Sequence, residues 1–186
     1  MTNHKELVDW AYSVMPTPKT TTETMPFKEG DWVYQPKIDG KRCIAVVAPT
    51  GALLLSKNQK LYGQLSPAAV RESGDHYKSG CQGSFAIYDC ELLSGNLWVF
   101  DTFVLDGKKL SNLSWTARHS MSPSGLLLGR AELRLLPSLT SGEQPSVEAL
   151  EELRAGLAWT QRVEGIIARR ESATLGGRPT VFKQKP

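Results

Sequence analysis

The distribution of apolar and polar residues predicts a helix at the start of the chain and mostly strands after it. Between Lys5 and Val14, apolar residues recur at the spacing of an amphipathic helix. The segment 16–24 is rich in threonine and proline, which predicts a loop. The next apolar segment begins near Trp32, so the first long predicted strand leads directly to Lys37.

Most of the later segments also have strand-like patterns. A hairpin is predicted where the apolar segments 43–48 and 52–56 flank a Pro-Thr-Gly turn. Further strands are predicted at 84–93, 97–105, 131–136, 163–170 and 180–185, and helices at 67–78 and 147–159. The mixture lacks regular βαβ alternation, and no repeat or linker divides it. The sequence therefore predicts one α+β domain, residues 1–186, built on largely antiparallel β-sheets flanked by helices.

The composition is typical of a globular intracellular protein. Of the 186 residues, 40% are hydrophobic and 22% are charged, which allows a buried core and argues against disorder. The formal charge of +3 would suit a polyanionic partner but does not by itself indicate one. Cys43, Cys81 and Cys90 match neither a zinc site nor a disulfide framework, and no signal peptide or membrane-spanning run is apparent. We therefore expect a cytoplasmic monomer with reduced thiols and no membrane association.

Four segments carry charged groups at the ends of predicted strands. They are Lys-Ile-Asp-Gly-Lys-Arg at 37–42, the acidic and aromatic stretch 88–101, Glu-Gly at 164–165, and Lys-Gln-Lys-Pro at 183–186. Each alone has an ordinary explanation, such as a turn or the exposed face of an edge strand. Lys37 is nevertheless a candidate nucleophile, because the strand fixes its backbone while the following glycine allows close approach.

Together and in this order, the segments resemble the covalent nucleotidyltransferase superfamily of ATP-dependent DNA ligases, RNA ligases and mRNA capping enzymes. The Lys-x-Asp-Gly element of that superfamily corresponds to Lys37, Asp39 and Gly40. The resemblance runs from about Asp31 to the end of the chain, with 1–30 as a preceding helix and loop. It implies an ATP-grasp-like nucleotidyltransferase domain.

Several details of the resemblance favour DNA ligases over the other branches. Arg42 follows the Asp-Gly by one residue, as in DNA ligases, and Ser-Lys-Asn at 56–58 is similar to their Ser-Arg-Asn element. Asp-Cys-Glu at 89–91 approximates their Asp-Gly-Glu. Glu-Gly at 164–165 matches ligases, whereas capping enzymes typically have Asp-Gly there.

The resemblance implies a catalytic group built on Lys37, which would receive AMP from ATP. Its attack on the α-phosphate needs a neutral amine, and the cations Lys183 and Lys185 would lower its pKa and offset charge on the phosphate. Mg²⁺ is expected as the metal, with Glu164 as an oxygen ligand and Asp39 as a second carboxylate. Asp39 could instead brace the turn.

The resemblance also implies contacts to the nucleotide and the nucleic acid. Arg42 and Glu91 would bind the ribose hydroxyls, Phe100 would stack on adenine, and Lys57 would contact a phosphate of the nicked strand. Phe100 could equally belong to the core and Lys57 to the solvated surface. Gln35 stands where DNA ligases commonly have a glutamate that recognises adenine. Its carbonyl can still accept a hydrogen bond from the adenine amino group, but the charge is lost.

The implied activity is ATP-dependent sealing of nicked double-stranded DNA, as in DNA repair and replication. AMP would pass to Lys37 and then to a 5′-phosphate, and a 3′-hydroxyl would displace it. An RNA ligase, a capping guanylyltransferase and a weakened nucleotide- or nucleic-acid-binding module of the same fold are alternatives. The chain stops at Pro186, where such enzymes usually continue into an OB-fold domain. We expect an excised domain, a minimal ligase, or a protein that borrows DNA clamping from a partner.

Overall fold

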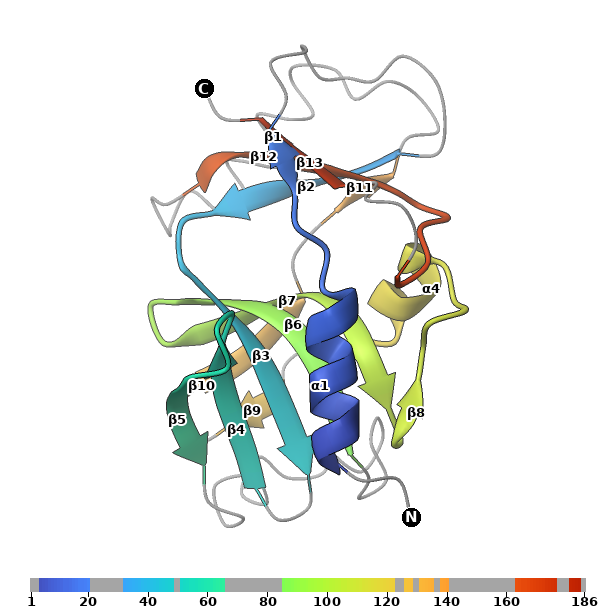
Figure 1. Cartoon of the computed structure of the whole chain (residues 1–186). Coiled ribbons are helices and arrows are strands. Elements are labelled where there is room, and N and C mark those ends of the chain that lie inside the picture. Colours follow the sequence, from blue (N-terminus) through green and yellow to red (C-terminus); the bar gives the residue numbers. More distant parts are fainter. Residues whose placement is uncertain are drawn as a thin grey trace.

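Two predominantly antiparallel sheets and a helix beside the larger one carry the fold (Figure 1). The computed structural model describes residues 4–20, 32–48, 51–65, 85–122, 126–128, 131–135, 138–140, 163–176 and 181–184. The α+β class with largely antiparallel sheets is confirmed. The helices predicted at 67–78 and 147–159 lie outside the described residues.

The larger sheet, here called sheet B, has the strand order β5-β4-β3-β6-β7-β10-β9, with β8 paired to β7. Its strands are β3 (Lys41–Ala48), β4 (Gly51–Ser56), β5 (Leu61–Leu65), β6 (Ala86–Leu93), β7 (Asn96–Leu105), β8 (Lys108–Lys109), β9 (Leu126–Leu128) and β10 (Ala131–Leu135). The predicted hairpin is confirmed, since β3 and β4 pair antiparallel from Cys43 opposite Ser56 to Ala48 opposite Gly51. The pairing of β7 with β10 is parallel.

The smaller sheet, sheet A, has the order β1-β13-β12-β2-β11. Its strands are β1 (Lys19–Thr20), β2 (Trp32–Ile38), β11 (Leu139–Thr140), β12 (Val163–Arg170) and β13 (Val181–Gln184). The predicted strands at 163–170 and 180–185 are confirmed within the described residues. The prediction of a loop over 16–24 was wrong at Lys19 and Thr20, because these two residues pair in parallel with β13.

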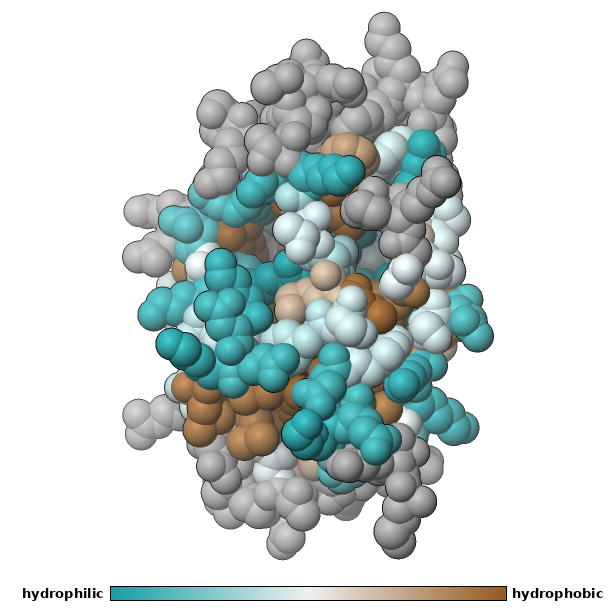
Figure 2. All heavy atoms as spheres, in the orientation of Figure 1, coloured by the Kyte–Doolittle hydropathy of each residue, from teal (hydrophilic) through white to brown (hydrophobic). Residues whose placement is uncertain are grey.

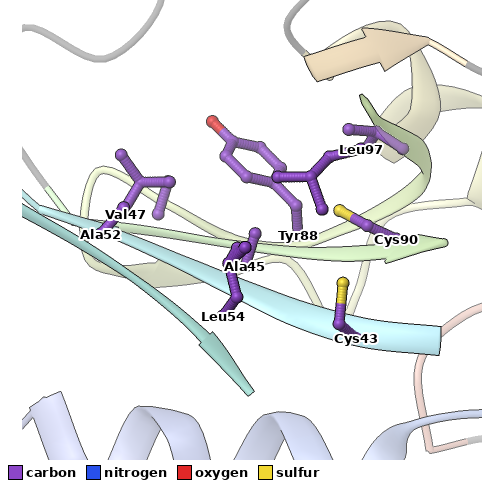
Figure 3. Packing of buried hydrophobic residues seen from close by; sticks show 10 residues of the cluster. Cys43, Ala45, Val47, Ala52, Leu54, Tyr88, Cys90 and Leu97 are labelled. Atoms are coloured by element: carbon purple, nitrogen blue, oxygen red, sulfur yellow. The ribbon is translucent and has the colours of Figure 1, made fainter. Parts of the chain in front are cut away.

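The core lies on both faces of sheet B. Helix α1 (His4–Val14) lays Leu7 and Ala11 against one face, where they pack with residues such as Ile44 and Phe103. The opposite face packs Cys43, Tyr88 and Cys90 with their neighbours (Figure 3). Because both faces are covered, β3 is apolar at successive positions from Cys43 to Ala48 instead of alternating.

Cys43 and Cys90 are directly opposite each other on β3 and β6, and both thiols point to the face away from α1 (Figure 3). Burial raises the pKa of Cys43 to about 12 and raises that of Cys90 as well. Both cysteines are free thiols. They are therefore protonated packing groups at neutral pH, whereas reactive cysteines have depressed pKa values.

Apolar side chains also reach the surface over β4 and β5 (Figure 2). Leu53 on β4 is 37% exposed and Leu61 on β5 is 57% exposed. The exposed apolar area therefore lies at the end of sheet B that β5 and β4 form. In the part of the chain that the structure describes, no helix has the length and apolar character needed to cross a membrane.

Candidate active site

A cavity of about 320 Å³ lies between the inner face of sheet A and one end of sheet B. On the sheet A side, its lining includes Gln35 and Lys37 of β2, Ile167 and Arg169 of β12, and Val181 and Lys183 of β13. Side chains two residues apart share a face of a strand, so each strand contributes a pair. Strand register places Gln35 opposite Ile167, and Ile167 opposite Lys183. Three distant segments of the sequence thereby meet in one row.

The opposite wall comes from sheet B. Arg42 of β3 and Glu91 of β6 are cross-strand partners, and Phe100 lies on β7 beside them. These side chains line the same cavity as the residues of sheet A. Lys57 follows β4 and is exposed at the rim. The sheet-to-sheet arrangement therefore brings together charged groups that the sequence separates widely.

Lys37 forms an ion pair with Glu164 through its Nζ atom and the carboxylate Oε1. The two side chains are partly buried, with 21% and 28% exposed. A bulge between Val163 and Ile166 interrupts the pairing of β12 with β2, and Gly165 within it has a φ of 150°. Bulges re-aim side chains at strand ends, so this one accounts for the direction of Glu164 towards the candidate nucleophile.

Gly40 allows the turn after Lys37 to approach β6 closely. A Cβ atom at this position would lie 2.6 Å from the Leu92 carbonyl oxygen and 2.8 Å from Cγ of Glu91. The backbone N–H of Gly40 also donates to the Glu91 carboxylate. Removal from water raises the pKa of Glu91 to about 7, although Lys37, Arg42 and this hydrogen bond oppose the rise.

Arg42 binds protein groups on two sides. Its Nε and Nη2 atoms donate to the Asp89 carboxylate at 3.0 and 2.5 Å, and Nη1 donates to the carbonyl of Pro16 at 2.8 Å. Burial tends to lower the pKa of Arg42, but the charge and hydrogen bonds of Asp89, together with the charges of Glu91 and Asp101, outweigh this and raise it. Arg42 thus ties β3 to β6 and to the segment after α1, while it also lines the cavity.

Phe100 lies between the core and the cavity. It packs against the buried cluster of Ile38, Leu93 and Trp98 and also lines the cavity. The guanidinium carbons of Arg42 and Arg169 lie 5.6 and 5.8 Å from its ring centroid. Phe100 therefore packs with the core and also faces the cavity, and its stacking on adenine stays a prediction.

Comparison with known proteins gives matches by structure. No protein-family model matches the sequence, and no curated protein sequence matches it. Mycobacterial DNA ligase D complexed with ATP and MES is similar at 16% identity with a TM-score of 0.58, covering 91% of this chain and 60% of the ligase. Bacteriophage T7 ATP-dependent DNA ligase in complex with ATP gives 14% identity and 0.58, covering 93% and 69%. A Lig E DNA ligase gives 16% and 0.52, covering 92% and 68%.

The chain has the nucleotidyltransferase fold of ATP-dependent DNA ligases. It spans about three fifths of the mycobacterial enzyme, 60% of that chain. The resemblance noted in the sequence is confirmed at the level of fold, and it extends further towards the N-terminus than expected. The expected start was near Asp31, whereas the structural matches cover 91% to 93% of the chain.

Some of the site residues predicted from the sequence are not among the residues that line the cavity. Asp39 is exposed in the turn after β2. Glu164 reaches the site through its ion pair with Lys37, and Lys185 lies outside the described residues. Among the described residues there is no group of three or more histidine, cysteine or carboxylate side chains that could cage a metal. Mg²⁺ usually binds through one or two carboxylates with substrate phosphates, and the single carboxylate of Glu164 fits that mode.

Other residues of the cavity were not predicted from the sequence. Pro16 and Pro18, from the connection between α1 and β1, complete its wall. Arg169 is only 5% exposed, and its Nη1 atom lies 3.8 Å from the Asp101 carboxylate. Arg118 holds Asp101 from the other side, with Nε and Nη2 bonds of 2.8 and 2.9 Å. Simple alternation from Glu164 would place Arg169 on the opposite face of β12, and the bulge between Val163 and Ile166 changes that alternation, so the position of Arg169 could not be predicted from the sequence.

Proposed function

We propose that the chain is the nucleotidyltransferase domain of an ATP-dependent polynucleotide ligase that acts on nicked double-stranded DNA through a lysyl-AMP intermediate. The observation that carries the proposal is the shared cavity of residues identified independently by sequence. Its lining includes Gln35, Lys37, Arg42, Lys57, Glu91, Phe100 and Lys183. These come from both sheets, and a purely structural explanation would not require them to converge.

The nucleotide would bind across the two walls of the cavity. Phe100 offers an aromatic face and Ile167 an apolar one, which together suit a stacked purine. Glu91 can accept hydrogen bonds from the ribose hydroxyls. Lys183, in the row that continues from Ile167, provides positive charge for the α-phosphate. The cavity thus offers a base wall, a ribose acceptor and a phosphate cation.

In the first step, the Lys37 Nζ lone pair attacks the α-phosphorus of ATP. A P–N bond forms, the bond from the α-phosphorus to the bridging oxygen breaks, and pyrophosphate leaves. The amine must be neutral, and Glu164 Oε1, in contact with Nζ, is available to accept its proton. Once that proton has passed on to solvent, the Glu164 carboxylate could hold Mg²⁺ together with the phosphates, and the ion would neutralise charge that develops in the transition state. Lys183, with Lys185 as the second predicted lysine, would add to this stabilisation.

In the two later steps, the adenylate passes to the nucleic acid. An oxygen of the 5′-phosphate attacks the lysyl-AMP phosphorus, the P–N bond breaks and Lys37 is released. The 3′-hydroxyl then attacks the 5′-phosphorus, a phosphodiester forms and AMP leaves. Lys57, exposed at the cavity rim, is a cation for the backbone of the nicked strand. We propose that a further domain or a partner supplies the remaining grip on DNA.

The test is covalent labelling. The protein is incubated with Mg²⁺ and ATP radiolabelled at the α-phosphate, then denatured. We expect label that survives denaturation, is lost in Lys37→Ala and remains in Lys41→Ala, because Lys41 is exposed at the start of β3. Labelled protein is then mixed with nicked DNA or nicked RNA, and transfer of label identifies the acceptor. Absence of label in the unmodified protein, or equal labelling of Lys37→Ala, would refute the proposal.

A further inference from the structure

Gln35 carries a buried amide without a hydrogen bond in the wall of the cavity. Its side chain is 0% exposed, and both Oε1 and Nε2 lack a partner among the described residues. It lies on β2 two residues before Lys37. Buried amide groups in proteins are nearly always bonded, so an unbonded one facing a cavity indicates that the occupant completes its hydrogen bonds.

Arg169 provides a second buried group of this kind beside Gln35. Its Nε atom has no hydrogen-bond partner among the described residues, and its side chain is 5% exposed. Ile167 lies opposite Gln35 in the register of β12 and β2, so Arg169, two residues further, is the diagonal neighbour of Gln35 on the same wall. Burial lowers the pKa of Arg169 to about 10, which leaves it cationic at neutral pH.

The two purines differ in the group that such a wall would meet. Adenine has an amino group at C6, which donates a hydrogen bond, and guanine has a carbonyl, which accepts one. An amide such as Gln35 can present either its oxygen or its nitrogen to that position by rotating its terminal group. A carboxylate could only accept. The guanidinium of Arg169 donates only, which suits N7 of either purine and O6 of guanine.

We propose that this cavity accepts both purine nucleotides and that the chain uses GTP as well as ATP to modify Lys37. Gln35 allows both purines because its amide can accept a hydrogen bond from adenine or donate one to guanine. Arg169 donates a hydrogen bond to the carbonyl of guanine. The inference rests on the proposed function, in which the purine stacks on Phe100, and it adds that the C6 group of the purine faces Gln35. It deepens that function, because it defines the nucleotide class that the site takes.

The experiment compares label from ATP and from GTP, each radiolabelled at the α-phosphate, in the unmodified protein and in Gln35→Glu. We expect the unmodified protein to be labelled by the two nucleotides at initial rates within about ten-fold of each other. In Gln35→Glu the ratio of GTP to ATP labelling should fall by at least about ten-fold, because the carboxylate opposes the guanine carbonyl. Gln59→Glu, the same change at an exposed turn position, should leave the ratio unchanged.

Arg169→Lys is the second variant, in case Gln35→Glu does not fold. It keeps the positive charge but loses the guanidinium fork, so GTP labelling should fall more than ATP labelling. Label from ATP alone in the unmodified protein, or an unchanged ratio in both folded variants, would overturn the inference and leave the ligase proposal standing. If neither nucleotide gives label, the ligase proposal fails. Modification of Lys37 by either nucleotide then fails as well, and calorimetry decides the remaining part of the inference, that the cavity accepts both purine nucleotides, which is overturned unless ATP and GTP bind with similar affinity.

Discussion

A carboxyl group in the wall of the candidate active-site cavity gives the stability of the folded protein a measurable dependence on pH. Removal from water raises the pKa of Glu91 from its ordinary value of 4.5 to about 7, against the opposing charges of Lys37 and Arg42. Its oxygen atoms accept the N–H of Gly40, so a neutral Gln at this position can keep the bond. Glu91→Gln therefore removes the titration with little change in shape.

The direction and size of the change in the free energy of unfolding with pH follow from linkage between protonation and folding. The folded state binds the proton of Glu91 more tightly than the unfolded state does, so this group favours folding below about pH 4.5 and the benefit is lost as the pH rises through about 7. At about 1.4 kcal/mol per pH unit, the loss amounts to about 3 kcal/mol. Most of it should fall between pH 5 and pH 8. Over that range the free energy of unfolding of Glu91→Gln should rise relative to that of the unmodified protein.

Urea denaturation of both proteins at pH 5, 6, 7 and 8 measures this difference. Only the difference is interpreted, because other titrating groups affect both proteins alike. Glu6→Gln is the matched control, since Glu6 is exposed on the first turn of α1 and faces no cavity described here. Parallel pH profiles for Glu91→Gln and the unmodified protein would refute the reasoning. So would a free energy of unfolding of Glu91→Gln that falls, relative to that of the unmodified protein, as the pH rises.

Two further substitutions test the supports of the cavity. Gly40→Ala brings a Cβ atom to 2.6 Å from the Leu92 carbonyl oxygen. We therefore expect the free energy of unfolding, measured by urea denaturation, to fall by roughly 1–3 kcal/mol and labelling of Lys37 to weaken. Unchanged stability and labelling would contradict the close approach. Arg118→Met leaves the buried Asp101 carboxylate with Arg169, at 3.8 Å, as its remaining cation among the described residues, and it should cost roughly 3–5 kcal/mol. A thermal-denaturation loss below about 1 kcal/mol would show that Arg118 is not its main partner.

The sequence predicted the elements that have a long periodic pattern of apolar residues. It did not predict those elements whose formation depends on contacts with distant parts of the chain or that are too short to show a period. The helix at 4–14 and the hairpin 41–56 follow directly from periodicity and a turn. Strand β1 has two residues and exists because it pairs with β13. Helix α4 (Trp115–Ser120) was not predicted because six residues carry too little periodicity. Its N-cap at Ser114 and the buried Trp115 define it.

In the candidate site, too, residues in short motifs could be predicted from the sequence, whereas contacts that depend on strand register could not. Lys37 and Lys183 could be identified because each belongs to a short motif that keeps its spacing in the sequence. The bond between Arg42 and Asp89 could not, although both residues were in recognised motifs, because it depends on the register of β3 with β6. Arg169 was missed for a similar reason, since only the pairing of β12 with β2 brings it beside Gln35.

The segment before the first motif shows why the site cannot be assigned to the motifs alone. Helix α1 packs on sheet B, and β1 pairs with β13 of sheet A, with Thr20 opposite Lys183. Between them, the Pro16 carbonyl accepts a hydrogen bond from Arg42 and lines the cavity with Pro18. One continuous stretch thus contacts a residue on each wall and connects the two sheets. The separation of Lys183 from the cavity wall on sheet B therefore depends on residues that precede the first recognised motif.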